Sequence, residues 1–218
     1  MTISSSPKLT KGGIVLIDPE TAQVQRVIAL QYNAESLKRE LKSQESGGEA
    51  GADRAEPTRF KGPAGETISF EADLDATDQL EFPDQNAAAV AYGIAPQIAL
   101  LESLSQPGSA QLGKVNSQAS SGTLEIAPML APLLLLVWGA GRVIPVKLTS
   151  FSVTEEAFDP ALNPIHAKAS LSLRVLTVDD LGFASKGGSL FMAYLQNREQ
   201  LAAKAQPASL STLGVAGV

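Results

Sequence analysis

The sequence predicts a mainly β protein of the α+β class, with mostly antiparallel strands, one helix between the first and second sets of strands, and a C-terminal helix. Two observations predict it. Segments with apolar side chains at every second position recur along the chain, most clearly at residues 66–75 and 167–176. Such alternation is typical of strands with one buried and one solvent-facing side. Residues 95–104 and 189–204 instead carry apolar side chains at helical spacing.

The N-terminal part predicts one hairpin between two polar segments. Residues 1–11 are polar and are expected to be flexible. Strands at residues 14–17 and 24–32 flank the turn sequence Asp18-Pro19-Glu20-Thr21. Residues 35–41 are expected to form a polar connector. Residues 43–58 contain several glycines and no apolar anchor, which predicts a mobile arm. The arm is either a surface insertion or a segment that becomes ordered against a neighbouring subunit.

The middle of the chain predicts a strand and two helices. In residues 66–75, Ile68, Phe70, Ala72 and Leu74 are expected to face inward. Asp84 is the expected N-cap of a helix over residues 84–92. The better helix covers residues 95–104, with Pro96 in its first turn and an apolar stripe of Ile98, Leu101 and Leu104. Residues 106–121 have the composition of a loop.

Residues 126–138 form an apolar run that ends at Trp138 and is followed by glycine. The run is shorter than the ~20 residues that a membrane-spanning helix needs. Pro128 and Pro132 also disfavour a helix interior. We therefore expect a buried core strand, with no insertion of the protein into a membrane.

A long hairpin follows the apolar run. Its two strands lie at residues 143–154 and 167–176, with Asp-Pro and Asn-Pro turn sequences between them. A β-bulge near residues 149–150 is expected, because only a bulge places four apolar side chains of the first strand on one face. These are Val146, Leu148, Phe151 and Val153. In the second strand Ala167, Ala169, Leu171, Leu173 and Val175 share the inward face.

The C-terminal segment, residues 181–205, predicts a docking helix that starts near Ser189. Its apolar stripe consists of Leu190, Phe191, Tyr194 and Leu195. A glycine-rich joint at residues 185–188 is expected to let the helix swing away from the domain. The stripe then binds a neighbouring subunit or another protein, and the alternative is that it packs on its own sheet. Residues 206–218 are expected to be a disordered tail.

The ordered set of segments resembles the contractile injection system tube-protein family, the short adaptors of phage-tail-like particles. The similar segments are Leu134-Leu-Leu-Val-Trp-Gly139, Pro145 to Thr154, Phe158-Asp-Pro160 and Ala167 to Leu173. Leu30-Gln-Tyr-Asn-Ala-Glu-Ser-Leu37 resembles a further family box, with Ala34 where proline is usual, and Phe60 to Phe70, continued by Leu74-Asp-Ala-Thr-Asp78, resembles another.

The resemblance implies a tail-tube-like antiparallel β-barrel or sandwich, packed by one helix, over residues 12–180. It also implies assembly as a homo-hexamer. Its role would be structural, as a ring that joins the inner tube to the spike and hub of the baseplate, with other baseplate proteins as neighbours. Assembly would take place in the cytoplasm. The polar side chains expected to line the lumen of the ring are Lys147, Ser170, Ser172 and Arg174. Two alternatives are a main inner-tube subunit of the same particle and a monomeric module that binds a ligand or an envelope polymer.

The sequence offers little for catalysis, cofactors or metals. Cysteine is absent and His166 is the single histidine, so thiolate and multi-histidine metal sites are not available. An acidic cluster lacks the spacing of an EF-hand and is expected to be a strand's solvent face and nearby loops. It comprises Glu71, Asp73, Asp75, Asp78, Glu81 and Asp84. The net charge of −6 argues against a nucleic-acid partner. We expect no enzyme activity and no cofactor.

Overall fold

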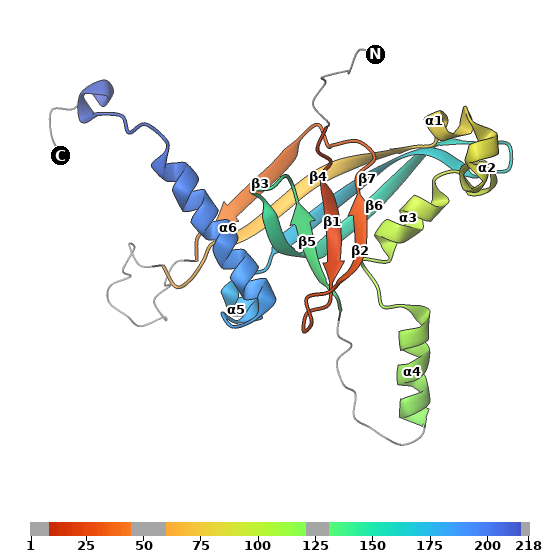
Figure 1. The fold of residues 1–218 in the computed structure, drawn as a ribbon, viewed down its shortest axis with the longest axis horizontal. Coiled ribbons are helices and arrows are strands. Elements are labelled where there is room, and N and C mark those ends of the chain that lie inside the picture. Colours follow the sequence, from red (N-terminus) through yellow and green to blue (C-terminus); the bar gives the residue numbers. More distant parts are fainter. Residues whose placement is uncertain (1–8, 45–59, 121–130, 215–218) are drawn as a thin grey trace, which may run out of the picture.

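The computed structural model describes residues 9–44, 60–120 and 131–214, which form one seven-stranded sheet (Figure 1). The strand order is β2-β1-β5-β6-β7-β4-β3, and every pairing is antiparallel. The strands are β1 Gly13–Ile17, β2 Val24–Ala29, β3 Leu37–Lys42, β4 Gly65–Asp75, β5 Leu133–Val137, β6 Val143–Phe158 and β7 Pro164–Val175. The predicted antiparallel, mainly β fold of the α+β class is confirmed.

The sheet is open, so the predicted closure into a barrel is wrong for the described residues. β2 and β3 lie at its two ends, and each pairs with a single strand. Helices α3 (Ala95–Glu102) and α6 (Lys186–Ala203) contribute buried side chains to the same core as the sheet. Because these helices cover the apolar face, the sheet buries it without curling onto itself or packing on a second sheet.

The long hairpin of β6 and β7 has the predicted bulge. The pairing shifts by one residue between Leu148 and Ser150. As a result Leu148 lies opposite Leu173 and Phe151 lies opposite Leu171. The apolar side chains before and after the bulge therefore face the core. In the turn, the Asp159 carboxylate accepts hydrogen bonds from the side chain and the N–H of Asn163, which lower the pKa of Asp159.

The first hairpin is also confirmed, whereas the polar connector after it is wrong. Asp18 Oδ1 accepts from the N–H groups of Glu20 and Thr21 at 2.9 and 2.7 Å, which closes the β1–β2 turn. Most of the residues expected to form the polar connector belong instead to the edge strand β3, which pairs with β4 from Leu37 to Lys42. Edge strands are often charged, and β3 has no row of buried apolar side chains that would mark it as a strand in the sequence.

The helices between β4 and β5 differ from the prediction in two places. They are α1 Thr77–Leu80, the 3-10 helix η1 Pro83–Gln85, α2 Ala87–Tyr92, α3 and α4 Ser109–Ser120. The helix expected to start at Asp84 is divided into η1 and α2, and Asn86 is the N-cap. The segment expected to be a loop forms α4, which has no buried residue and so no apolar stripe to reveal it. In α3, Ile98 and Leu101 are buried as predicted.

Strand β5 carries apolar side chains into two clusters. Leu134 and Leu136 belong to the main core, and Leu133 and Leu135 belong to a second cluster on the other side. The described part of the apolar run is therefore a core strand. The first residues of the run, 126–130, and the preceding residues 121–125 lie outside the described residues. No helix in the described ranges is long and apolar enough to cross a membrane.

The glycine-rich segment before α6 is a close contact and not a flexible joint. Helix α6 begins at Lys186, with the Ser185 hydroxyl accepting from Gly188 N–H at 2.9 Å, so Ser185 and not Ser189 is the cap. A Cβ at Gly187 would lie 2.6 Å from the Leu181 side chain of α5 (Val178–Leu181), and one at Gly188 would overlap the Gly182 carbonyl. The glycines let α5 and α6 pack together.

Two segments that were predicted to be flexible, the N-terminus and the arm, are described only in small part. Residues 1–8 of the N-terminus and 45–59 of the arm lie outside the described residues. The tail is described as far as residue 214 and contains the exposed 3-10 helix η2 Leu210–Leu213, a short ordered turn that its composition did not predict.

Trp138 at the end of β5 provides a test of core packing. Its ring centroid lies 5.6 Å from that of Phe70, and a Cβ at Gly12 would approach the indole to 2.7 Å. Trp138→Ala should lower the free energy of unfolding by about 3 kcal/mol, measured by denaturant titration. The control is Phe183→Ala, since Phe183 is 70% exposed and should change little. An unchanged denaturation midpoint for Trp138→Ala would contradict this packing.

Candidate assembly site

The polar face of β4, β7 and β6 is built from cross-strand rows. Because side chains alternate along each strand, the residues between the core positions form the opposite face of the sheet. Lys147 lies opposite Arg174, and Ser150 and Ser152 lie opposite Ser172 and Ser170. The structure therefore brings the four residues predicted for a lumen onto adjacent rows of one face, away from the core.

Hydroxyl groups occupy the middle of this polar face. The Ser69 hydroxyl donates to the Ser172 hydroxyl at 3.3 Å, and Thr149 Oγ1 donates to the Ser172 carbonyl at 2.9 Å. A shallow hollow is lined by serines of all three strands, namely Ser69, Ser150, Ser152, Ser170 and Ser172. The centre of the face therefore consists mostly of hydroxyl groups, with the Glu71 carboxylate beside them. Such hydrogen-bonding groups suit contact with water.

Two of the cations on the polar face, Arg174 and Lys147, differ in their partners. Arg174 makes two hydrogen bonds to the carboxylate of Asp180 on α5, at 3.1 and 2.9 Å. Burial acts to raise the pKa of Asp180, but hydrogen bonds from Arg174 and from the Thr177 N–H lower it overall. Lys147 is exposed and has no ion pair among the described residues. Arg174 is therefore held by the fold, and Lys147 is free to meet another molecule.

One edge of β6 is open over most of its length. β6 pairs with β5 only from Val143 to Val146, although the strand continues to Phe158. Within the described residues, no strand pairs with this edge beyond Val146. The backbone groups of an open edge are able to pair with another strand.

The two end strands of the sheet carry different side chains. On β3, Lys38, Glu40 and Lys42 are exposed, which is typical of an edge that resists pairing. On β2, Val24 and Val27 are 61% and 62% exposed. An exposed apolar edge strand favours association with another chain.

The predicted docking stripe of α6 lies mostly in the chain's own core. Phe191 and Tyr194 are each 5% exposed and belong to the main core cluster, and Leu195 packs against it. Leu190 packs against the second cluster instead. The expectation that this stripe is free for a partner is therefore corrected in favour of the alternative. The tight packing of α6 on α5 and the buried contacts described next explain why.

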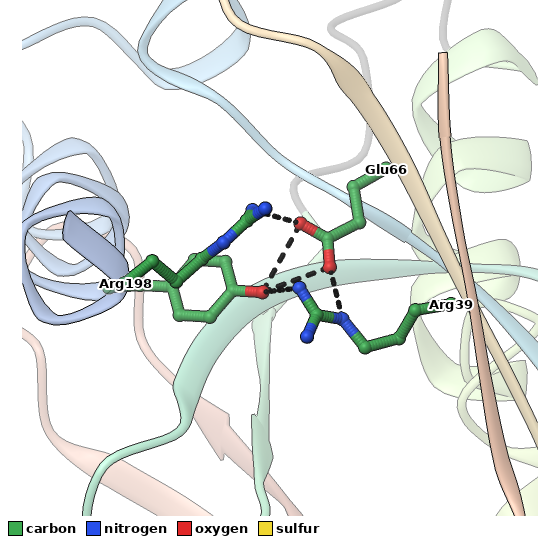
Figure 2. A network of polar contacts seen from close by, with 4 residues as sticks. Arg39, Glu66 and Arg198 are labelled. Carbon is green, nitrogen blue, oxygen red and sulfur yellow. Dashed lines mark hydrogen bonds and ion pairs between the residues drawn. The ribbon is translucent and has the colours of Figure 1, made fainter. Parts of the chain in front are cut away.

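A buried carboxylate attaches α6 to the sheet (Figure 2). Glu66, at the start of β4, is 3% exposed. It accepts from Arg39 Nε of β3 at 2.8 Å and from Arg198 Nη1 of α6 at 3.0 Å. Tyr194 Oη donates to Glu66 Oε1 at 2.9 Å and accepts from Arg39 Nη2 at 2.9 Å. Every oxygen of the carboxylate therefore has charged or polar partners, which a buried charge requires.

The electrostatic effects within this network agree with its geometry. Burial and the adjacent Glu66 carboxylate raise the pKa of Tyr194. Burial acts to lower the pKa of Arg39, but the hydrogen bond and the charge of Glu66 raise it overall. Tyr194 therefore stays protonated and able to donate. The sequence did not reveal this network, because Glu66 has the parity of the apolar side chains of β4 and its partners are far away in the chain.

The remaining candidate residues meet where the pairing of β4 and β7 ends, with Asp75 opposite His166. His166 Nδ1 lies 3.0 Å from Glu156, and Lys168 lies 3.7 Å from the same carboxylate. Asp75 accepts from the side chain and N–H of Thr77, which lower its pKa. No group of three or more acidic or histidine side chains in the described ranges is arranged to hold a metal ion. Asp75 thus serves a turn, and Glu156 holds an ion pair.

Comparison with protein families gives one match. A family model described as "Contractile injection system tube protein" matches residues 8–181. The matched part contains the whole sheet and α5, and it ends before α6. A comparison with curated proteins finds no match.

The Glu66 network predicts a specific pattern of stability. Replacing both cations (Arg39→Met with Arg198→Met) leaves the buried carboxylate without a charge partner and should cost about 3–5 kcal/mol of unfolding free energy. Either single substitution should cost less than half of that, since the other guanidinium still neutralises Glu66. Lys186→Met, on the same helix and exposed, is the control. Additive single effects in a double-mutant cycle would refute the shared role of the two arginines.

Proposed function

Since the chain belongs to the contractile injection system tube protein family, we propose that it forms a hexameric ring that joins the inner tube to the hub and spike of the baseplate. As a member of this family it has a structural role in a contractile injection system. The ring, its six-fold symmetry and its place next to the baseplate are the proposal. The protein would act by holding its neighbours in position, without catalysis or a cofactor.

The open edge of β6 is the observation that carries the proposal. From Lys147 to Phe158 this edge has no strand partner in the described part of the chain. It lies beside partly buried apolar side chains of the same strand, Leu148, Phe151 and Val153. A strand from a neighbouring subunit would satisfy the backbone groups and cover these side chains together. Repeating that contact around a closed ring gives the β6 edge of every subunit a partner and leaves only the charged edge strand β3 unpaired.

We place β2 of the neighbouring subunit against this edge. Both β2 and β3 end the sheet, but only β2 presents exposed valines, Val24 and Val27. Burying both valines would contribute more apolar area than β3 offers, since β3 exposes lysines and one apolar side chain, Leu41 (45%). The contact is heterologous, because one copy supplies β6 and the next supplies β2, as a cyclic ring requires.

The polar face then faces the lumen of the ring. Its central hydroxyls and the free cation Lys147 are the kind of groups that line a water-filled passage. The opposite face is covered by α3 and α6 and is apolar, so it cannot face water. The lumen role of Lys147, Ser170, Ser172 and Arg174 therefore remains the preferred assignment.

Two measurements separate this role from the alternatives. An adaptor ring would be present in one or two copies per particle, whereas a main tube subunit would be present in many. A monomeric binding module would stay monomeric at all concentrations and would not associate with particles. Quantitative mass spectrometry of purified particles and light scattering of the isolated protein decide between the three.

Blocking β2 tests the ring. Val27→Lys places a charge on the proposed interface and should weaken ring formation by at least about tenfold in dissociation constant, measured by light scattering over a concentration series. Leu213→Lys is the matched control, because Leu213 is 71% exposed on η2, outside the sheet. A hexamer that forms equally well with Val27→Lys would exclude β2 as the partner strand.

Single cysteines test the lumen, which is possible because the chain has none of its own. Ser170→Cys in assembled rings or tubes should react with a small maleimide but be protected from a maleimide carried on a protein too large to enter. Ser120→Cys, at the exposed end of α4, should react with both. Equal reaction of both cysteines with the large reagent would place the polar face outside.

A further inference from the structure

The polar face of the sheet carries its charges in a definite order along the strands. Residues that lie directly opposite one another on neighbouring strands share a face of the sheet. The register therefore defines rows of side chains that run across β3, β4, β7 and β6. Along β4 the rows can be followed from Thr67, near the start of the strand, to Asp75 at its end.

The rows near the start of β4 are basic. Lys147 lies in the row of Thr67, and Lys38 lies in the row of Ser69. Both lysines are exposed, and neither has an ion pair among the described residues. Their ammonium groups are therefore available to a partner.

The other charges near these basic rows are balanced within the chain. Glu40 lies 3.4 Å from Lys42, and Arg174 lies 2.9 Å from Asp180. Each of these pairs neutralises itself at close range. The positive charge of this part of the face therefore comes from the two free lysines.

The rows toward the end of β4 are acidic. Glu71, Asp73 and Asp75 follow one another at every second position, so their side chains lie on the same face. Lys168 is the lysine of these rows, and it lies 3.7 Å from Glu156. Asp73 Oδ1 is buried and accepts no hydrogen bond within the described part of the chain. This part of the face therefore combines excess negative charge with an acceptor that lacks a donor.

Hydroxyl groups separate the basic rows from the acidic rows. The serine-lined hollow described above lies between them, at Ser69, Ser172 and Ser170. Thr67 and Asp73 are six residues apart on β4, which corresponds to about 20 Å along the strand. This separation exceeds the Debye length of ~8 Å at physiological ionic strength. The two groups of charges therefore do not cancel, and each acts on the part of a partner that lies next to it.

We propose that the polar face binds a polypeptide segment in one direction, with acidic side chains next to Lys38 and Lys147 and basic side chains next to Glu71 and Asp73. The reversed segment would bring like charges together, which disfavours it. The hydroxyls between the two groups can donate to and accept from the peptide groups of the segment. A nucleic acid is negative along its whole length, so the acidic rows would repel it.

The inference rests on the proposed function in one respect. In a ring, equivalent faces of all subunits would line the lumen and act together on a segment inside it. The charge order itself belongs to a single subunit. Directional binding can therefore be measured whether or not rings form, which keeps the two proposals separable.

Synthetic peptides test the recognition of charge. The probe is a bipolar peptide with a glutamate block, a glycine-serine spacer of about six residues that spans ~20 Å when extended, and a lysine block. Peptides of equal length with two glutamate blocks or two lysine blocks are the comparison. By fluorescence anisotropy, the bipolar peptide should bind at least about tenfold more tightly than either. It should lose at least about tenfold in affinity between about 50 mM and about 500 mM salt.

Single cysteines test the direction of binding, since the chain has none of its own. Ser150→Cys lies in the row of Ser69, beside the lysines, and Thr154→Cys lies in the row of Asp73. A bromoacetyl group on the acidic end of the bipolar peptide should alkylate Ser150→Cys at least about fivefold faster than Thr154→Cys. The same group on the basic end should show the reverse preference. Rates with free bromoacetamide correct for the intrinsic reactivity of each thiol.

Neutral variants assign the effect to the charges. Lys38→Gln with Lys147→Gln should weaken the bipolar peptide to the affinity of the two-lysine-block peptide. Glu71→Gln with Asp73→Asn should weaken it to the affinity of the two-glutamate-block peptide. Each pair should also reduce the difference in alkylation rate between the two cysteines. If the second pair loses its thermal transition, Glu71→Gln alone replaces it, because Glu71 is exposed.

A matched control changes charges away from the polar face. Glu102→Gln on α3 with Lys204→Gln at the end of α6 removes one charge of each sign at exposed sites and should leave binding unchanged. Equal alkylation of both cysteines by either end of the peptide would overturn the inference. A single-sign peptide that binds as tightly as the bipolar one would also overturn it. Normal rings without directional binding would overturn the inference alone, whereas directional binding without rings would contradict only the proposed function.

Discussion

The strict alternation of side chains across β4, β7 and β6 is the constraint from which the other features follow. Since each strand turns alternate residues to opposite faces, a single slip in pairing would exchange the buried and polar sets. The bulge between Leu148 and Ser150 avoids that exchange within β6. It keeps Leu148 and Phe151 on the core side while the serines remain on the other side. One face is thereby available for packing helices, and the other for contact with water.

The apolar face created in this way has to be covered, and α6 covers part of it. Phe191 and Tyr194 supply the buried area. Glu66 adds a requirement of a different kind, because a buried carboxylate is costly unless it is paired and hydrogen-bonded. Its partners come from the edge strand β3 and from α6, so the helix and the edge of the sheet are fixed relative to each other (Figure 2). The C-terminal helix is therefore part of the domain, although the family match ends before it.

Period-two patterning was sufficient to predict β4, the β6–β7 hairpin and its bulge, because those strands bury one face. It failed for β3, where Lys38, Glu40 and Lys42 lie on an edge and no buried row is visible. The search for helical spacing likewise missed α4, because α4 has no buried residue and so no apolar stripe. Gly187 and Gly188 suggested a hinge, but their small size serves contacts with Leu181 and Gly182 that only the tertiary structure creates. The Glu66 network was invisible for the same reason, since its arginines are 27 and 132 residues away.

The polar face and the open β6 edge together connect this fold to assembly. The sheet ends at β2 and β3 without closing, and β6 extends well beyond its last contact with β5. Closure between neighbouring subunits is the arrangement that would complete the sheet. A cryo-electron microscopy map of assembled particles containing this chain tests that claim most directly. We expect a ring in which a strand of the adjacent subunit pairs with β6 from Lys147 onward and the serines line the lumen. A ring in which this edge of β6 faces solvent, or is covered by its own chain, would contradict the account.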